Sequence, residues 1–413
     1  MLLSFLTRRS LVYALSAALL LAAASARGEP ANSAWPVLLH DSQNTGRSDL
    51  YRGPQGPSPV IAWEYKNKAG RTGVTVGPPI PGSPNGVVYF GDGKKPITAL
   101  NPDDGSVIWH MTDGSVGQAD KSTPSVGANG AVYMGERGNN LWAADADDGG
   151  IQWKFKVPVD GDVRTSPAIA LDGTIFMASG AIGNGRTYAM NPDGTIKWQI
   201  SFHAPLQNIA PALSLDEQTV YFGVNRSEVA AVDAATGAIL WRIQYSKRGR
   251  GGSKANHSVV VGPDGTLYFG SRDGLFAIDP TDGSVLWHFD TGDLAIQSAP
   301  ALAADGTLYV GASGVPATFF AINGDGTLKW KHVMTGGRGR FLNNQAVIDA
   351  DGTIFVTYSR FLYSFDPAGD GMGGGKVNWL MVFRRSFKNG PAIGGDGVLY
   401  VANGRSVMKV VDP

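Results

Sequence analysis

Eight tryptophans recur at nearly equal spacing along the chain, and this spacing constrains the fold more than any other feature. Neighbouring members stand 43 to 49 residues apart, and most end a shared motif such as DGSVIW or DGTIKW. The eight are Trp63, Trp109, Trp153, Trp198, Trp241, Trp287, Trp330 and Trp379. A period in the mid-forties that carries only strand-like segments is typical of a β-propeller with one blade per repeat. We expect these indoles to be structural and to wedge between neighbouring blades.

Each repeat contains four apolar segments divided by turn signals. The fifth repeat shows them at 258–262, 266–271, 275–279 and 284–289, with an Asp-Gly pair after each of the first three. Alternating apolar and polar residues predict antiparallel strands, and Asp-Gly supplies the positive-φ conformation of tight hairpins. The 56 glycines and 24 prolines suit many short strands joined by turns. Each repeat is therefore predicted to be a four-stranded blade.

The two ends of the repeat array complement each other. The last repeat stops at Pro413 after its third strand, whereas residues 60–66 (VIAWEYK) form a Trp-containing strand with no partner nearby in the sequence. Pairing these ends would complete the last blade and leave no exposed sheet edge within the ring. We predict one all-β domain over 60–413, an eight-bladed β-propeller of four-stranded antiparallel blades, closed by pairing the N-terminal strand with the C-terminal blade.

The first residues have the pattern of an export signal. Arg8 and Arg9 precede an apolar run over 11–24, and small residues suited to cleavage follow. We predict a signal peptide over 1–26, an N-terminal extension over 27–59, and a periplasmic or secreted mature protein. The two arginines also resemble a twin-arginine signal, so both export routes stay open.

The composition limits the classes of partner. The chain has 35 basic and 35 acidic residues, a balance that argues against a nucleic-acid partner. It contains no cysteine, so it forms no disulfide and carries no lipid-modified N-terminal cysteine. We expect a monomeric ring with no membrane span in the mature chain.

The repeat and the segment before it resemble one known family. The recurring pattern, an aliphatic strand followed by Asp or Asn, Thr-Gly or Asp-Gly and a final Trp, is similar to the repeat of the PQQ-like (quinoprotein-type) propellers. The segment WPVLLHDSQNTGRS over 35–48 resembles the entrance sequence of that family. The resemblance implies the propeller fold but leaves the activity open, since the family includes quinone-dependent dehydrogenases and non-catalytic proteins. One non-catalytic branch is similar to the scaffold propeller of the outer-membrane barrel-assembly machinery.

The chain departs from the catalytic members that the resemblance brings in. Those members usually hold the quinone with a disulfide of neighbouring cysteines, a calcium ion with Glu and Asn, and an Asp base. Here there is no cysteine, and no Glu lies in any first-strand segment. No two of the six histidines have metal-ligand spacing on one strand, so we predict no metal site and no catalytic residue.

Two functions follow from the resemblance and these departures. The first is a non-catalytic binding or scaffold protein of the bacterial envelope with a protein or peptide partner and no cofactor. The alternative is a small periplasmic PQQ-dependent oxidoreductase of alcohols or sugars, with PQQ and calcium as cofactors and Asp120 as the base.

The candidate binding residues precede the first strand of each blade. The residue three before the Pro-Ala that starts these strands is polar in nearly every repeat, and we expect it at the mouth of the central channel. The set is Lys121, Arg164, Asn208, Lys254, Gln297, Asn343 and Lys388, with Asn256 as the alternative to Lys254 in the fifth repeat. Thr75 takes the equivalent place in the first repeat. Together with arginines in the same class of loop, the set would form a cationic funnel for a carboxylated ligand, a phosphate or an acidic peptide. These arginines are Arg248, Arg250, Arg338, Arg340, Arg384 and Arg385. The alternative is that these side chains only line a water-filled channel, with aspartates such as Asp162 balancing the charge.

Overall fold

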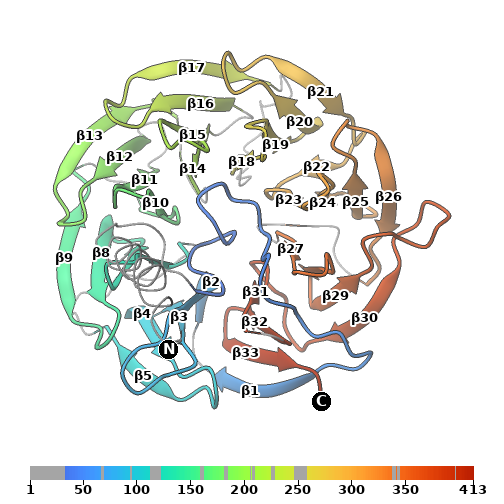
Figure 1. Ribbon diagram of the computed structural model, residues 1–413, viewed down its shortest axis with the longest axis horizontal. Coiled ribbons are helices and arrows are strands. Elements are labelled where there is room, and N and C mark those ends of the chain that lie inside the picture. The colour runs from blue at the N-terminus through green and yellow to red at the C-terminus, as the bar shows by residue number, and fades with distance from the viewer. Residues whose placement is uncertain are drawn as a thin grey trace, which may run out of the picture.

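The computed structural model describes residues 33–66, 69–93, 95–111, 122–158, 162–180, 185–204, 206, 210–224, 228–245, 258–336, 341, 345–395 and 397–413. The predicted signal peptide lies outside these residues. Eight antiparallel sheets stand round a central axis (Figure 1), which confirms the eight-bladed all-β propeller. Within the described ranges, the structure has no helix of the length and apolar character that a membrane span requires.

Blades 1 to 4 follow one another along the chain, each with its innermost strand first. Blade 1 consists of β2 (Ala69–Gly77), β3 (Val87–Asp92), β4 (Lys95–Leu100) and β5 (Val107–His110). Blade 2 consists of β6 (Ser125–Val126), β7 (Ala131–Gly135), β8 (Asn140–Asp145) and β9 (Ile151–Lys156). Blade 3 consists of β10 (Ala168–Ile169), β11 (Ile175–Ser179), β12 (Arg186–Met190) and β13 (Ile196–Ser201). Blade 4 consists of β14 (Ala212–Leu213), β15 (Thr219–Val224), β16 (Glu228–Asp233) and β17 (Ile239–Gln244).

Blades 5 to 8 continue the ring, and the last one takes its outer strand from the other end of the domain. Blade 5 consists of β18 (Val260–Val261), β19 (Leu267–Ser271), β20 (Gly274–Ile278) and β21 (Val285–Phe289). Blade 6 consists of β22 (Ala295–Ile296), β23 (Ala301–Leu302), β24 (Leu308–Ser313), β25 (Thr318–Ile322) and β26 (Leu328–Val333). Blade 7 consists of β27 (Val347–Ile348), β28 (Ile354–Tyr358), β29 (Phe361–Phe365) and β30 (Val377–Val382). Blade 8 consists of β31 (Ala392–Ile393), β32 (Val398–Ala402), β33 (Ser406–Val411) and β1 (Val60–Lys66).

The ring closes as the sequence predicts. Strand β1 pairs antiparallel with β33, from Val60 opposite Val411 to Lys66 opposite Ser406. The Ser406 hydroxyl donates a hydrogen bond of 2.5 Å to the Glu64 carboxylate across the same pair. The first strand of the domain, β1, therefore completes the last blade beside the C-terminal strand β33 (Figure 1).

Seven of the eight repeated tryptophans bond to the next blade round the ring. In all eight the indole Nε1 donates to a backbone oxygen at 2.7 to 3.2 Å, which in these seven cases belongs to the turn between the third and fourth strands of the next blade. In blade 3, for example, Trp198 donates to Ala234, and its ring packs over Gly237. Blade 8 lacks this turn because its outer strand comes from β1, and Trp379 donates instead to Pro54 of the N-terminal extension. These bonds fix the spacing of adjacent blades.

In blades 2 to 8 the innermost strands have only two residues each and are shorter than the sequence suggests. The prediction of a first strand over 258–262 was too long, because the structure pairs only Val260 and Val261 of β18 with β19. The residues at its two ends bond elsewhere: the Ser258 hydroxyl accepts from the Ala210 backbone N–H, and Val261 donates to Gln43. Near the axis, bonds to neighbouring blades and to the extension take the place of a longer ladder within the blade.

Candidate functional site

Residues 35–53 of the N-terminal extension form a strap that runs round the inside of the ring. The strap makes at least one hydrogen bond to every blade, and it lies across the centre in Figure 1. The bonds, at 2.8 to 3.0 Å, are Val76 to Trp35, Val126 to Pro36, Ser42 to Ile169, Leu213 to Ser42, Val261 to Gln43, Leu302 to Thr45, Ile348 to Gly46 and Gly397 to Arg52. Most of the blade residues end an innermost strand, so the strap covers the side of the ring that carries the turns between first and second strands.

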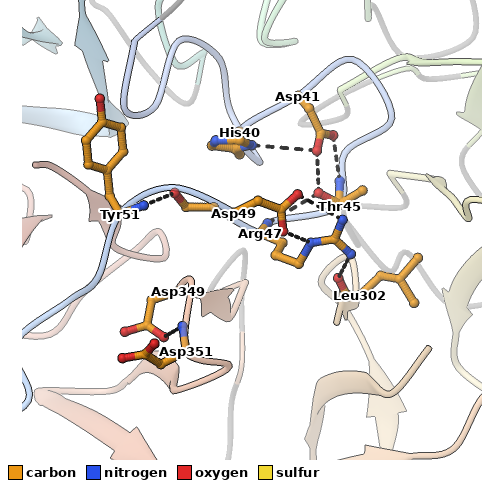
Figure 2. Close-up of polar contacts among 10 residues, drawn as sticks. His40, Asp41, Thr45, Arg47, Asp49, Tyr51, Leu302, Asp349 and Asp351 are labelled. Atoms are coloured by element: carbon orange, nitrogen blue, oxygen red, sulfur yellow. Dashed lines mark hydrogen bonds and ion pairs between the residues drawn. The ribbon is translucent and has the colours of Figure 1, made fainter. Parts of the chain in front are cut away.

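The strap is held in shape by its own polar side chains. The Asp41 carboxylate accepts the Thr45 backbone N–H at 2.8 Å and also the Thr45 hydroxyl. His40 Nδ1 lies 3.6 Å from the same carboxylate. Arg47 pairs with Asp49 at 2.7 Å and reaches the backbone oxygen of Leu302 in blade 6 (Figure 2). These contacts give the polar residues of the entrance sequence a structural role.

One buried carboxylate joins the end of the strap to blade 7. Asp349 accepts hydrogen bonds from the Gly53 backbone N–H at 3.0 Å, the Gln55 side-chain amide at 2.7 Å and the Thr353 backbone N–H at 2.9 Å. Burial raises the pKa of Asp349, and the hydrogen bonds oppose that rise without cancelling it. Its surroundings are backbone donors of the strap and the adjacent turn, so its role is to anchor the strap.

The polar side chains of the innermost strands also connect blades. The Thr75 hydroxyl donates to Pro124 of the next blade at 2.6 Å, and Ser125 donates to Pro167 of the blade after that at 2.6 Å. The Ser122 hydroxyl donates to Thr165 at 2.9 Å. Since these groups are buried and bonded to backbone oxygens, they are not available to a ligand in the channel.

The predicted funnel is only partly within the described residues. Outside them lie Lys121, Asn208, Lys254 and Asn343, and also the loop arginines Arg248, Arg250, Arg338 and Arg340. Arg164 precedes β10 of blade 3 and pairs with Asp162 at 2.5 Å, so aspartate balances its charge. Gln297 is half-buried between β22 and β23 of blade 6. Lys388 is exposed in the loop before β31 of blade 8, so the three described members belong to three separate blades.

Lys388 lines a cleft that the sequence did not reveal in full. The cleft has a volume of about 480 Å³ and lies where the loop between blades 7 and 8 meets the loop between β32 and β33. It is lined by Arg384, Arg385, Ser386, Lys388, Asn403, Gly404 and Arg405. The sequence did not indicate Arg405, because it lies in a loop between second and third strands, whereas all the predicted residues precede first strands.

The described residues do not fit the quinone–calcium pair of the catalytic relatives. Within the described ranges no three His, Asp or Glu side chains are grouped to hold a metal ion. The sequence offers no cysteine for a disulfide against the quinone. The hydroxyl groups of Thr75 and Ser125 on the innermost strands are bonded to neighbouring blades.

The fold and the strap define the class of this protein as an eight-bladed propeller of quinoprotein type. A family model described as outer membrane protein assembly factor BamB matches residues 60–224 and 225–371. The chain belongs to this family of PQQ-like repeat propellers.

Solved structures of two functional kinds are similar to this fold. The quinohemoprotein alcohol dehydrogenase from Comamonas testosteroni is 14% identical with a TM-score of 0.72, over 96% of this chain and 84% of that one. BamB from Moraxella catarrhalis is 16% identical with a TM-score of 0.63, over 86% of this chain and 98% of that one. At these identities the likeness shows the fold alone.

A curated polyvinylalcohol dehydrogenase from a Pseudomonas species is similar over part of its length. It is 27% identical over 177 residues, which make up 38% of this chain and 28% of that protein. The similar proteins therefore include both dehydrogenases and an assembly factor.

Proposed function

We propose that the protein is a non-catalytic binding or scaffold propeller of the bacterial envelope, which engages a protein or peptide partner through its loop side. We use "loop side" for the face that carries the connections between second and third strands and between consecutive blades. The observation that carries the proposal is the strap: it covers the turn side of the ring and bonds to all eight blades. The loop side is then the face whose residues can vary and bind a partner.

The remaining support comes from the residues and the family. The inner hydroxyls of Thr75 and Ser125 donate to neighbouring blades, and the matching family model carries the description of an outer membrane assembly factor. The export signal predicted over 1–26 would place the mature protein in the periplasm. Arg164, Gln297 and Lys388 are the described members of the proposed binding face.

Crosslinking from the two sides of the ring tests this proposal. A photo-reactive residue would replace Val315, which is 94% exposed in the loop between β24 and β25, in the full chain within the bacterial envelope. The matched control replaces Leu215, which is 55% exposed in the turn between β14 and β15 on the opposite side. We expect one defined adduct from position 315 and none from position 215. Free monomer from both positions, or identical adducts from both, would contradict the proposal.

The alternative is a quinone-dependent dehydrogenase, and its support is the curated dehydrogenase that is 27% identical over part of this chain. The described residues lack the metal-binding group and the cysteines of that chemistry, and Asp120 lies outside them. Purified protein supplied with PQQ and calcium would decide the matter. Reduction of a redox dye that depends on an added alcohol or sugar would establish the alternative and displace the scaffold proposal.

A further inference from the structure

The cleft between blades 7 and 8 is built from two loops on the loop side. One loop, over 383–391, joins β30 to β31, and the other, over 403–405, joins β32 to β33. The cleft holds about 480 Å³, which is within the size range of small-molecule sites. Three arginines and one lysine contribute to its lining.

The first loop is anchored by two buried phenylalanines. Phe383 and Phe387 pack edge to face with ring centres 4.8 Å apart. Their backbone N–H groups donate to Arg360 and Ser359 at 2.8 and 2.6 Å. Because these residues point into the core, the side chains between and after them are exposed, including Arg384, Arg385 and Lys388. The cations of this loop are therefore carried on a fixed backbone.

The second loop is a tight turn closed by Asn403. The Asn403 side-chain oxygen accepts hydrogen bonds from the backbone N–H groups of Arg405 and Ser406 at 3.2 and 3.1 Å. The Asn403 backbone N–H donates to the Ser406 backbone oxygen at 3.1 Å. Gly404 has a φ of +80°, a conformation that glycine adopts without strain. The turn places Arg405 opposite the first loop, and it leaves the Asn403 amide N–H groups as further donors.

The cleft concentrates positive charge without a balancing carboxylate. Seven residues line it, four of them cationic and none acidic. In the described part of the chain no ion pair involves Arg384, Arg385, Lys388 or Arg405. Other cations of this protein, such as Arg52 and Lys376, do pair with aspartate. A like-charged group of this kind attracts anions, since a bound anion relieves the mutual repulsion.

We propose that this cleft binds a ligand that carries two or more oxyanion groups, either carboxylates or phosphates. Guanidinium groups bind both groups through two parallel hydrogen bonds, and three of the four cations are arginines. Charged donors predominate in the lining, which favours an anion over a neutral sugar. A cleft of about 480 Å³ also exceeds the volume of a single phosphate, so several anionic groups fit together. This site depends on the cleft alone and does not rest on the proposed scaffold function.

Two sources can supply this chemistry, and direct binding to the full chain distinguishes them. The probes are tripolyphosphate and citrate as small polyanions, and an octaglutamate peptide as an acidic chain segment, with an octaglutamine peptide as the neutral control. Calorimetry at low and high salt measures each affinity. We expect binding of at least one anionic probe that weakens as salt rises, and no binding of octaglutamine. Tighter binding of the peptide points to an acidic segment of a partner, and tighter binding of the small anions points to a free ligand.

Variants connect the binding to these residues. Arg385→Gln with Arg405→Gln removes one charge from each loop, and the matched control, Lys156→Gln with Lys331→Gln, removes two exposed charges elsewhere. We expect the cleft variant to lose affinity by about 10-fold or more, because each charge-assisted bond is strong, and the control to change it by less than about 2-fold.

The result that overturns the proposal is equally direct. No binding of any anionic probe, or equal loss of affinity in both double variants, would show that the cleft is not an oxyanion site. Should the cleft double variant unfold, the single variant Arg405→Glu replaces it, because this exposed side chain has no core contact to lose. Unchanged affinity in that folded variant would refute the proposal.

Discussion

Asn44 offers the sharpest test of whether the strap stabilises the ring. Its side-chain amide is buried and donates to three backbone oxygens, those of Ala210 and Pro211 at 3.2 Å and of Val259 at 3.0 Å. These oxygens belong to the segments that lead into the innermost strands of blades 4 and 5. Asn44 also has a φ of 62°, in the left-handed region that asparagine tolerates better than alanine. One residue therefore joins two blades through a conformation that few side chains adopt.

Three substitutions at this position separate the contributions. Asn44→Gly keeps the backbone unstrained and removes the two amide hydrogens that the three backbone oxygens share, at a cost of about 2–4 kcal/mol. Asn44→Ala adds about 1 kcal/mol for the left-handed backbone. Asn44→Asp keeps the shape but directs a carboxylate at three oxygens, and we expect the largest loss at neutral pH, about 3–5 kcal/mol.

Denaturant unfolding measures these differences, and amide exchange locates them. The Leu213 and Val261 N–H groups donate to Ser42 and Gln43 of the strap, so both should exchange faster in every variant if the strap detaches. The Asp variant should regain stability as pH falls, because a protonated carboxyl group can donate again. An Asp variant as stable as the wild type at pH 7, with unchanged exchange at these two amides, would refute the assignment of the strap as a structural brace.

Two further predictions concern the blades themselves. Gly237→Ala should cost more stability than Gly306→Ala in thermal unfolding: both have positive φ (+77° and +82°), but an added Cβ at 237 lies 2.8 Å from the Trp198 ring and one at 306 meets nothing within 4 Å. Equal losses of about 1–2 kcal/mol would show that the cost comes from the positive-φ backbone alone and that the contact with the Trp198 ring adds nothing. Burial lowers the pKa of His332 below 6.5 despite its bond to the Gly375 oxygen, so the stability it contributes is present above pH 6.5 and is lost as pH falls towards its folded pKa. His332→Gln should flatten the stability profile between pH 7 and 5, and an unchanged slope would contradict this.

The blade architecture could be predicted because it repeats. Every repeat places a Trp at the same point, and seven of the eight indoles lie against a glycine and donate to a turn carbonyl of the next blade, as Trp198 does with Gly237 and Ala234. The closure of the ring followed from one unpaired strand, residues 60–66, and one incomplete repeat. These inferences use local patterns, which a single sequence displays directly.

The path of the strap could not be predicted in the same way. Residues 35–53 have no periodicity, and their course depends on positive-φ conformations at Leu39, His40 and Asn44. Their partners are backbone atoms of distant blades, such as Val259, which is 215 residues away from Asn44. Nothing in the side-chain pattern of the sequence identifies a backbone oxygen as a partner.

Only part of the candidate site could be predicted from the sequence, because its residues come from two different classes of loop. Aligning the residues before the first strands selected Lys388, but the cleft also needs Arg405 from a different class of loop. The same alignment selected Arg164, whose charge is balanced by Asp162 in the structure. Charge in a binding face depends on which loops meet, and that is a property of the ring rather than of one repeat.

The two sides of the ring are under different physical constraints, and this difference bears on function. On the turn side, glycines support the Trp rings and the innermost strands donate to the strap, so a substitution there disturbs the packing of a blade. On the loop side, buried anchors such as Phe383 and Phe387 hold a loop while exposed neighbours such as Lys388 have no packing role. Loop residues can therefore change chemistry without changing the blades. One ring can in this way carry different functions, and this is the physical reason why we propose the loop side of this chain as its binding face.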